Sequence, residues 1–383
     1  MGARPILLIT NDLGPRAGGI ETFILGLISQ LDGSKLVIYT SSQEGDRDFD
    51  QALATKYGVE VIRDKSKVLL PTPRVFADIA GVLRRYQSTV IWYGASAPLA
   101  WLAPFFKKIG VERQIGMTHG HEVWWAKVWP FSWALRRMGN SLDIVTYLGS
   151  FTRDAIKNSL GPHPQLVHIA PGISVEHFVP SPSGEKPVDL VTRYNLEGKS
   201  VLLSVGRLVH RKGQDRLIQA LPEIILQVPN VSLLLIGIGP REAHLRKLVR
   251  ELKVESYVQF LGRVQYNELP RHIQLGDVFA MPSRSRFFGL EVEGLGIVYL
   301  EASACGLPVI AGKSGGAPDA IREGITGVSV DGNNVHEIAK AAIDLLNNPV
   351  RAKAMGAAGR EWSVQQWNWP LWGEKFSALL RSK

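Results

Sequence analysis

Short runs of consecutive aliphatic residues alternate along the chain with longer segments of mixed polarity. Strands of a parallel sheet are buried on both faces, so they read as continuous apolar runs, and the spacers between these runs are long enough for crossover helices. The pattern predicts two groups of strands. They are residues 5–10, 35–40, 59–62, 89–93, 113–118 and 143–148 in the first half, and 200–206, 231–237, 257–262, 277–282 and 307–312 in the second.

Two such groups predict an α/β protein with two parallel-sheet domains. A length of 383 residues suits two domains of under about 200 residues each. A Pro/Ser/Gly-rich stretch over residues 180–187 predicts the linker between them. We therefore expect an N-terminal domain over 1–180, a C-terminal domain over 181–365, and a helical segment over 366–383 that packs back toward the N-terminal domain.

The composition, with 45% hydrophobic and 21% charged residues, is that of a folded soluble protein. The chain has no apolar run of about 18 residues or more, which argues against a transmembrane helix, and residues 1–10 lack the regions of a secretion signal. The single cysteine, Cys305, excludes an internal disulfide and fits a reducing cytoplasm. A cytoplasmic, enzyme-sized protein is predicted.

The net charge of +9 is concentrated in one part of the chain. Residues 61–137 contain twelve Lys and Arg against four acids, a net charge of +8, while the flanking segments are mildly acidic. Such a patch indicates a polyanionic partner: an anionic membrane surface, an acidic substrate or nucleic acid.

Glycines follow the first predicted strand. Gly18 and Gly19 immediately precede a helix-like run over residues 20–31. Glycines at a strand-to-helix turn allow backbone N–H groups to approach a phosphate, although such a turn is also common as a purely structural feature. The segment matches neither the dinucleotide-binding nor the P-loop pattern.

The second half carries charged residues at positions that suit a nucleotide. Arg207 and Lys212 lie in the loop after its first predicted strand, where open parallel sheets bind ligands, and two cations there could hold a diphosphate. Glu293 and Glu301 are eight residues apart, so both could lie near one edge of a helix. Taken singly, these residues also fit a solvated basic loop and two exposed helix carboxylates.

Together with further motifs they resemble a known family. The order is Gly18-Gly19, His119 in MTHGHE, Pro171-Gly172, Gly206-Arg207, Arg211 to Gly213, Gly237 to Pro240, and Glu293/Glu301 in a run ending EASACGLPVIA. This order resembles the retaining glycosyltransferases of family four, which have the GT-B fold of two facing Rossmann-like domains with an interdomain cleft. The resemblance covers nearly the whole chain.

The resemblance implies roles for individual residues. Gly18 and Gly19 would present backbone N–H groups to the donor phosphate, Arg207 and Lys212 would bind the diphosphate, and His119 would lie against the sugar. Glu293 would hold the transferred sugar, Glu301 the ribose, and Val264 the nucleobase. The donor site would also include Gly294, Leu295 and Gly296. His119, Arg207, Lys212 and Glu293 are the expected catalytic residues. A segment longer than usual in the family precedes Glu293 and contains a competing carboxylate, Glu291; we prefer Glu293 because of its spacing to Glu301 and the Gly-x-Gly that follows.

No metal or other cofactor is expected. The Asp46-Arg47-Asp48 stretch superficially resembles the D-x-D of metal-dependent transferases, but it lies in a polar loop with no preceding predicted strand. Cations and a helix start would stabilise the leaving diphosphate instead.

Tryptophans and basic residues are interleaved between residues 122 and 138. Trp125, Trp129 and Trp133 are spaced i, i+4, i+8, which lines them up on one helix unless Pro130 starts a new one. Such a mixture suits a membrane interface, although any single tryptophan could equally be core. The predicted acceptor and membrane surface consists of Trp124, Trp125, Lys127, Trp129, Trp133, Arg136 and Arg137.

Residues 281–321, with the segment GRLVHRKGQDRLI, resemble one subgroup of the family, the PimB-type GDP-mannose-dependent α-1,6 phosphatidylinositol-monomannoside mannosyltransferases. The resemblance implies GDP-mannose as donor, an anionic glycolipid acceptor, and a place at the inner face of the plasma membrane. Nucleic acid is not an expected partner, because no nucleic-acid motif accompanies the aromatic and basic residues. The alternatives are another donor or a soluble acceptor, a nucleotide-sugar epimerase, and a binding protein without turnover.

Overall fold

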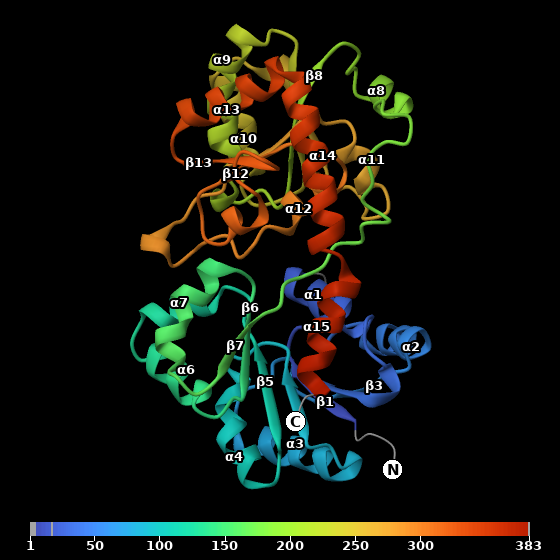
Figure 1. The fold of residues 1–383 in the computed structure, drawn as a ribbon, viewed down its shortest axis with the longest axis vertical. Helices are drawn as coiled ribbons and strands as arrows, with labels where there is room; N and C mark the ends of the chain where they lie inside the picture. The colour runs from blue at the N-terminus through green and yellow to red at the C-terminus, as the bar shows by residue number, and fades with distance from the viewer. Residues whose placement is uncertain (1–4, 17, 382–383) are drawn as a thin grey trace. The chain divides into compact units, whose positions relative to one another are not determined.

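A computed structural model describes residues 5–16 and 18–381, which form two compact units (Figure 1). Unit 1 takes the chain up to Gly172 together with the segment from Trp369 onward, and unit 2 is Ile173–Asn368.

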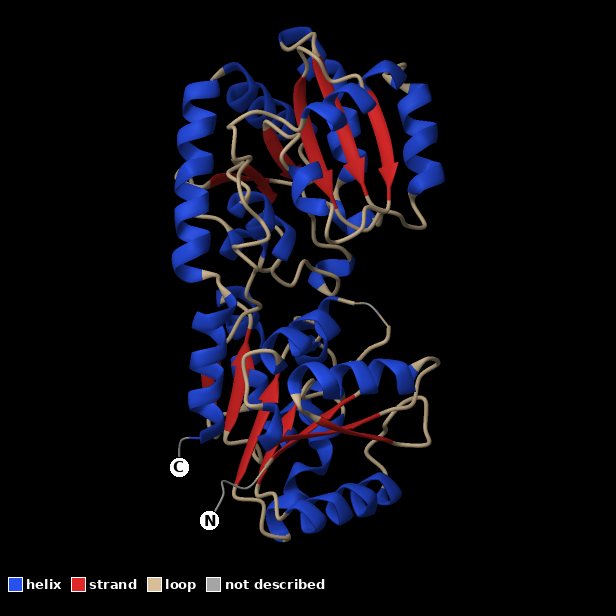
Figure 2. Ribbon diagram, turned by 90° about the vertical axis from the view of Figure 1, so that its right-hand side faces the viewer, coloured by secondary structure: helices blue, strands red, loops and turns tan. Residues whose placement is uncertain are grey.

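Unit 1 is built on a seven-stranded parallel sheet of order β3-β2-β1-β4-β5-β6-β7. The central strands β1 and β2 are almost wholly buried, because helices cover both faces of the sheet (Figure 2). The strands are β1 Ile6–Thr10, β2 Leu36–Thr40, β3 Glu60–Arg63, β4 Val90–Tyr93, β5 Arg113–Met117, β6 Ile144–Tyr147 and β7 Gln165–His168. The helices are α1 Gly19–Ile28, α2 Asp46–Tyr57, α3 Pro73–Tyr86, α4 Ala103–Lys108, α5 Glu122–Lys127, α6 Phe131–Gly139, α7 Ser150–Leu160 and α15 Trp369–Arg381.

Unit 2 repeats this plan with a six-stranded parallel sheet of order β10-β9-β8-β11-β12-β13. The strands are β8 Ser200–Val205, β9 Val231–Ile236, β10 Val258–Gly262, β11 Val278–Met281, β12 Val309–Gly312 and β13 Gly327–Val330. The helices are α8 Val188–Arg193, α9 Gln214–Gln227, α10 Glu242–Glu251, α11 Leu269–Ile273, α12 Ile297–Ala304, α13 Val335–Asn347 and α14 Pro349–Gln366. The order reverses beside the first strand in both sheets, which creates a crevice at the carboxyl edge of each.

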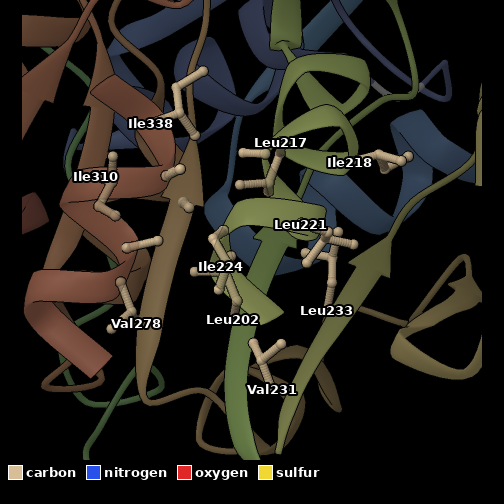
Figure 3. Close-up of a cluster of buried hydrophobic side chains, with 14 of the residues drawn as sticks. Leu202, Leu217, Ile218, Leu221, Ile224, Val231, Leu233, Val278, Ile310 and Ile338 are labelled. Atoms are coloured by element: carbon tan, nitrogen blue, oxygen red, sulfur yellow. The ribbon is translucent and has the colours of Figure 1, made fainter. Parts of the chain in front are cut away.

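The core of unit 2 is packed between its sheet and helices α9 and α13. Leu217, Leu221 and Ile224 project at helical spacing from α9 onto strand residues such as Leu202 and Leu233, and all five are fully buried (Figure 3). The packed core fixes the strands whose carboxyl ends carry the candidate site.

The boundary between the units differs from the predicted one. The chain enters unit 2 at Ile173, before the Pro/Ser/Gly-rich stretch, because α14 already holds this segment. Arg360 donates to the carbonyls of Val175 and Phe178 at 2.8 and 2.6 Å, and the Ile173 N–H donates to the Trp367 carbonyl at 2.7 Å.

The C-terminal helix belongs to unit 1. The chain leaves unit 2 between α14 and α15, and α15 lies against α1, where the Trp369 indole occupies the space that a side chain at Gly26 would need. Phe376 of the same helix packs on Trp92 of β4, with ring centroids 4.8 Å apart. The helix therefore supplies part of the core of unit 1.

Candidate active site

The residues predicted to bind the donor gather at the carboxyl edge of the unit 2 sheet. Arg207 and Lys212 follow β8, Val264 follows β10, and Glu293 follows β11. Because β8 and β11 are neighbours at the point where the strand order reverses, the loops after them flank the crevice. The sheet topology thus brings Lys212 and Glu293 together, although they are more than 80 residues apart in sequence.

Glu293 is buried in an ion-paired cluster. Its Oε2 atom lies 2.9 Å from Lys212 Nζ and 2.8 Å from Arg211 Nη1. Burial alone would raise the pKa of Glu293, but the charges of Lys212 and Arg211 outweigh it, and the pKa is lowered. Both contacts use Oε2, so Oε1 can accept hydrogen bonds from sugar hydroxyls.

The segment from Ser314 to Gly316 holds the backbone of Glu293 in place. The Glu293 N–H donates to Ser314 Oγ at 3.3 Å, and the Glu293 carbonyl accepts from the Gly316 N–H at 2.9 Å. Gly315 has φ +56°, and a Cβ there would lie 2.1 Å from the Glu293 carbonyl oxygen, so no larger residue fits. The carboxylate is therefore held in a defined position on a rigid loop.

Glu301 lies on α12, which begins after Gly296 in the left-handed conformation (φ +80°). Burial raises the pKa of Glu301 to about 7, and the Lys212 charge only partly offsets it. Tyr299 of the same helix is fully buried and donates from its hydroxyl to the Met281 carbonyl at 2.7 Å. The start of α12 is thereby tied to the end of β11.

The remaining predicted donor residues of unit 2 differ in their exposure. The Arg207 side chain is exposed, whereas Val264, Gly294 and Gly296 are half-buried and Leu295 is buried. They lie in the loops on the same edge as Lys212 and Glu293. The structure thus brings the unit 2 residues of the predicted site together, and their roles stay predictions.

Two arginines that the sequence analysis did not assign to the site also contribute. Arg211 contacts Glu293, and the Arg-Lys-Gly motif could have signalled it. Arg284 is 3% exposed and donates to both oxygens of Asp215 at 2.9 and 2.7 Å. Burial would raise the pKa of Asp215, but the hydrogen bonds and charge of Arg284 lower it. The ion pair between Arg284 and Asp215 joins the loop after β11 to α9, and no sequence motif predicts it.

The competing carboxylate, Glu291, points to different partners. It closes a tight turn over residues 286–291, which we call the aromatic turn, by pairing with Arg286 at 3.0 Å. Its other oxygen is 3.8 Å from Arg211 Nε, and its side chain is 36% exposed. The burial and the Lys212 contact of Glu293 favour Glu293 as the sugar-binding residue.

The unit 1 candidates lie at the carboxyl edge of their own sheet. His119 follows β5 and its Nε2 donates to the Gly94 carbonyl at 2.5 Å, which leaves Nδ1 as an acceptor. Burial lowers the pKa of His119, with Glu122 opposing, so a neutral ring is favoured. The His119 N–H donates to the buried Glu122 carboxylate at 2.9 Å.

Gly18 caps the start of α1, and a Cβ there would clash with the Glu21 carboxylate, whereas Gly19 has open space around it. Gly19 can therefore be approached closely by a ligand. Asp12 lies on the loop after β1, and burial together with the negative charge of Glu21 raises its pKa. The His119 ring lies edge to face with Phe23 of α1, with centroids 5.7 Å apart, so α1 and the loop after β5 lie near each other.

In the tryptophan-rich segment the structure follows the second of the two predicted arrangements, in which Pro130 starts a new helix. The segment forms two short helices: α5 ends at Lys127, and Pro130 is the N-cap of α6. The three tryptophans at i, i+4 and i+8 therefore do not share one helix, and Trp124 and Trp125 are half-buried against Phe131, at centroid distances of 4.7 and 5.1 Å. Trp129 and Trp133 are 80% and 57% exposed.

An apolar pocket of about 270 Å³ lies in this segment, lined by Pro71, Pro98, Trp101, Trp125, Pro130, Phe131, Trp133, Ala134 and Met138. Arg137 stacks on the Trp101 ring at 4.5 Å, Lys127 is exposed, and the exposed Arg136 donates to the Asn158 carbonyl. Exposed aromatic rings, cations and an apolar pocket are thus combined on one surface of unit 1.

The D-x-D-like stretch forms the first turn of α2. Asp50, in the same helix, pairs with Arg63 at 2.6 Å. Over residues 5–16 and 18–381, His, Cys, Asp and Glu side chains form no group of three or more that could hold a metal ion.

Comparison with known proteins identifies close relatives. Residues 192–362 match the family model of the glycosyl transferases group 1. The chain is 41% identical to the GDP-mannose-dependent α-(1-6)-phosphatidylinositol monomannoside mannosyltransferase of Mycolicibacterium smegmatis, over 99% of this chain and 98% of the relative. It is 39% identical to the corresponding monoacylated-acceptor enzyme of Corynebacterium glutamicum, over 100% and 99% of the two chains.

The fold is also that of a solved structure, Anabaena Alr3699/HepE in complex with UDP. The TM-score is 0.83 at 18% identity, over 99% of this chain and 100% of that one. This likeness concerns the fold alone and confirms the predicted class of two Rossmann-like domains. At about 40% identity along its whole length, the chain belongs to the group 1 glycosyltransferase family that contains the phosphatidylinositol monomannoside mannosyltransferases, as its sequence motifs predict.

Proposed function

We propose that this protein is a retaining mannosyltransferase that transfers mannose from GDP-mannose to the 6-position of a phosphatidylinositol monomannoside. The observation that carries the proposal is the 41% identity to an enzyme named for this reaction, over 99% of the chain. The identity extends over both units, so it includes the residues proposed for the donor and those proposed for the acceptor. A relative similar in unit 2 alone would support a nucleotide-sugar donor but would say nothing about the acceptor.

The donor would bind at the carboxyl edge of unit 2. Breaking the bond between mannose and phosphate leaves negative charge on the diphosphate, and Arg207, Arg211 and Lys212 supply positive charge at this edge. The start of α12 adds backbone N–H groups. Glu293 would accept hydrogen bonds from mannose hydroxyls through Oε1, and Glu301 from the ribose diol. Holding the donor in one orientation favours attack by the acceptor hydroxyl.

Lys212 and Glu293 also balance each other's charge. Lys212 is only 9% exposed, and its pairing with Glu293 compensates for the burial of both groups. A charged sugar-binding carboxylate and a diphosphate-binding lysine are thus positioned by one ion pair. Gly18, Gly19 and His119 are the unit 1 residues for which the family resemblance predicts phosphate and sugar contacts.

The acceptor would approach from a membrane surface. In the described residues, no helix is both long and apolar enough to cross a membrane. Exposed Trp129 and Trp133, with Lys127, Arg136 and Arg137, have the composition of a site that rests on anionic lipid. The apolar pocket beside Trp133 would accommodate part of an acyl chain. We therefore propose peripheral association with the inner face of the plasma membrane.

The decisive experiment supplies purified protein with radiolabelled GDP-mannose and monomannosylated phosphatidylinositol in detergent with EDTA. Label in a more polar lipid is expected, and linkage analysis of the product should show α-1,6. UDP- and ADP-sugars with soluble acceptors serve as controls. Turnover with those controls but none with the lipid would retain the family and discard this donor and acceptor.

Membrane association has a separate test. Flotation with anionic vesicles should retain the protein at low salt, and Trp129→Ser with Trp133→Ser should weaken retention. The matched control is Leu226→Ser, which removes another apolar side chain, 79% exposed, from α9 of unit 2. Equal retention of the tryptophan variant and the parent protein would contradict a membrane role for this surface.

A further inference from the structure

The aromatic turn, residues 286–291, exposes two phenylalanine side chains that do not pack in the core of unit 2. Phe288 is fully exposed and Phe287 is 61% exposed. The Arg286 guanidinium lies 4.6 Å from the centre of the Phe287 ring, so a cation accompanies the two aromatic rings. Rings presented to solvent in this way gain nothing from the folding of the chain itself.

The backbone of the turn is also unfavourable for these residues. Phe287 and Phe288 have φ of +48° and +55°, in the left-handed region where a Cβ is disfavoured and glycine is the usual residue. Backbone hydrogen bonds between Arg286 and Glu291, at 2.9 and 3.2 Å, close the turn. Strained positions of this kind concentrate at functional sites. Phenylalanines at two successive positions that favour glycine therefore indicate a contact outside the chain.

The base of the turn is joined to the candidate active site. Glu291 pairs with Arg286 and lies 3.8 Å from Arg211 Nε, and the same Arg211 contacts Glu293. On the preceding side, the Arg284 N–H donates to the Arg211 carbonyl at 2.8 Å, and Arg284 is anchored on Asp215. The exposed rings are thus held in a fixed position relative to the residue that would hold the transferred sugar.

We infer that the aromatic turn is a lipid-contacting element of unit 2: Phe287 and Phe288 enter the apolar region of the anionic lipid surface that carries the acceptor, and Arg286 meets a lipid phosphate. The inference rests on the proposed lipid acceptor. Phenylalanine has no hydrogen-bonding group for sugar hydroxyls, and an adjacent cation fits the boundary between acyl chains and phosphates. The turn then presents the acceptor headgroup close to Glu293.

Glycine substitutions give a clean test, because glycine adopts the left-handed conformation readily and the exposed rings make no core contact. The variant Phe287→Gly with Phe288→Gly is compared with the parent protein on two acceptors. One is the monomannosylated lipid in vesicles of phosphatidylcholine and phosphatidylinositol; the other is the same headgroup with its acyl chains removed. We expect kcat/KM on vesicles to fall roughly ten- to a hundredfold, and kcat/KM on the deacylated headgroup to change little.

The control Leu226→Ser should leave both values unchanged. An equal loss on both acceptors would show that the turn touches the headgroup or supports Glu293, and unchanged activity on vesicles would show no lipid contact; either result overturns the inference. If the parent protein transfers mannose to neither acceptor, the proposed function fails. Sedimentation of parent and variant with the same vesicles then still decides whether the turn binds lipid, and equal sedimentation contradicts the inference.

Discussion

The two units have sheets of the same strand order over their first six strands, but the chemistry at their carboxyl edges differs. In unit 2 the loops after β8 and β11 form an ion-paired cluster around a buried carboxylate, Glu293, with Lys212 and Arg211. In unit 1 the loops after β1 and β5 present glycines and a histidine whose ring is held neutral by burial. The shared strand order therefore places both sets of loops at a carboxyl edge, and the loop residues make the two edges chemically different: ion-paired and charged in unit 2, glycine-rich with a neutral ring in unit 1.

The largest expected effect comes from removing the carboxylate that distinguishes unit 2. Glu293→Ala should lower kcat for mannose transfer by about 10²–10³-fold, because a preorganised contact to the reacting sugar is lost. The control is Glu361→Ala, an exposed carboxylate on α14. Near-normal turnover of Glu293→Ala in the radiolabel assay would contradict the site assignment.

The next effect tests whether charge balance holds the cluster together. Lys212→Met should lower transfer roughly 10²-fold and lower the free energy of unfolding by about 1–3 kcal/mol, since Glu293 loses a buried partner. Lys212→Met combined with Glu293→Gln should recover most of the stability and none of the transfer, in denaturant titrations and rate assays respectively. Additive losses of stability in the double variant would exclude a coupled pair.

A smaller effect is expected in unit 1. His119→Ala should reduce transfer roughly tenfold, the value of one or two hydrogen bonds to the sugar. Because burial lowers the pKa of His119, the ring is neutral above pH 6.5, and the loss should be constant between pH 7 and 8. A reduction that disappears as the pH rises would indicate a charged histidine and break the contrast with unit 2.

The smallest effect on transfer concerns Glu301, whose pKa is raised from 4.5 to about 7. The folded state binds this proton more tightly than the unfolded state, so wild-type stability falls as the pH rises from 4.5 to about 7 and is lowest above that. Glu301→Gln should remove a penalty of at most about 3 kcal/mol at pH 8 and show no such benefit at pH 4.5. Affinity for GDP-mannose should fall severalfold, as measured by calorimetry. A stability difference that is independent of pH would contradict the raised pKa.

Eleven strands were readily predicted from the sequence, and two edge strands were not. Each of the eleven predicted aliphatic runs overlaps a strand, the edge strands β3 and β10 included, because most strands of a covered parallel sheet read as apolar runs. The edge strands β7 and β13 were missed: QLVH and GVSV are short and partly exposed, so they lack a continuous apolar run.

The predicted site residues of unit 2 do lie at one edge, since motif spacing and sheet topology agree there. The ion pair between Arg284 and Asp215 could not be predicted, because it joins residues 69 positions apart and depends on tertiary packing. Nor could the left-handed backbone at Phe287 and Phe288 be predicted, because this conformation favours glycine and phenylalanine gives no sign of it. The sequence did indicate that the segment before Glu293 is unusually long.

The chain passes from unit 1 to unit 2 at Gly172 and returns at Trp369, so unit 2 is inserted into unit 1. During synthesis on the ribosome, the contiguous unit 2 can complete its core while unit 1 still lacks α15. Until then the surfaces of Trp92 and Gly26 that later receive Phe376 and Trp369 have no partner from that helix. A helix translated after the whole of unit 2 therefore completes the core of unit 1, and loss of α15 would damage the N-terminal half of the protein most.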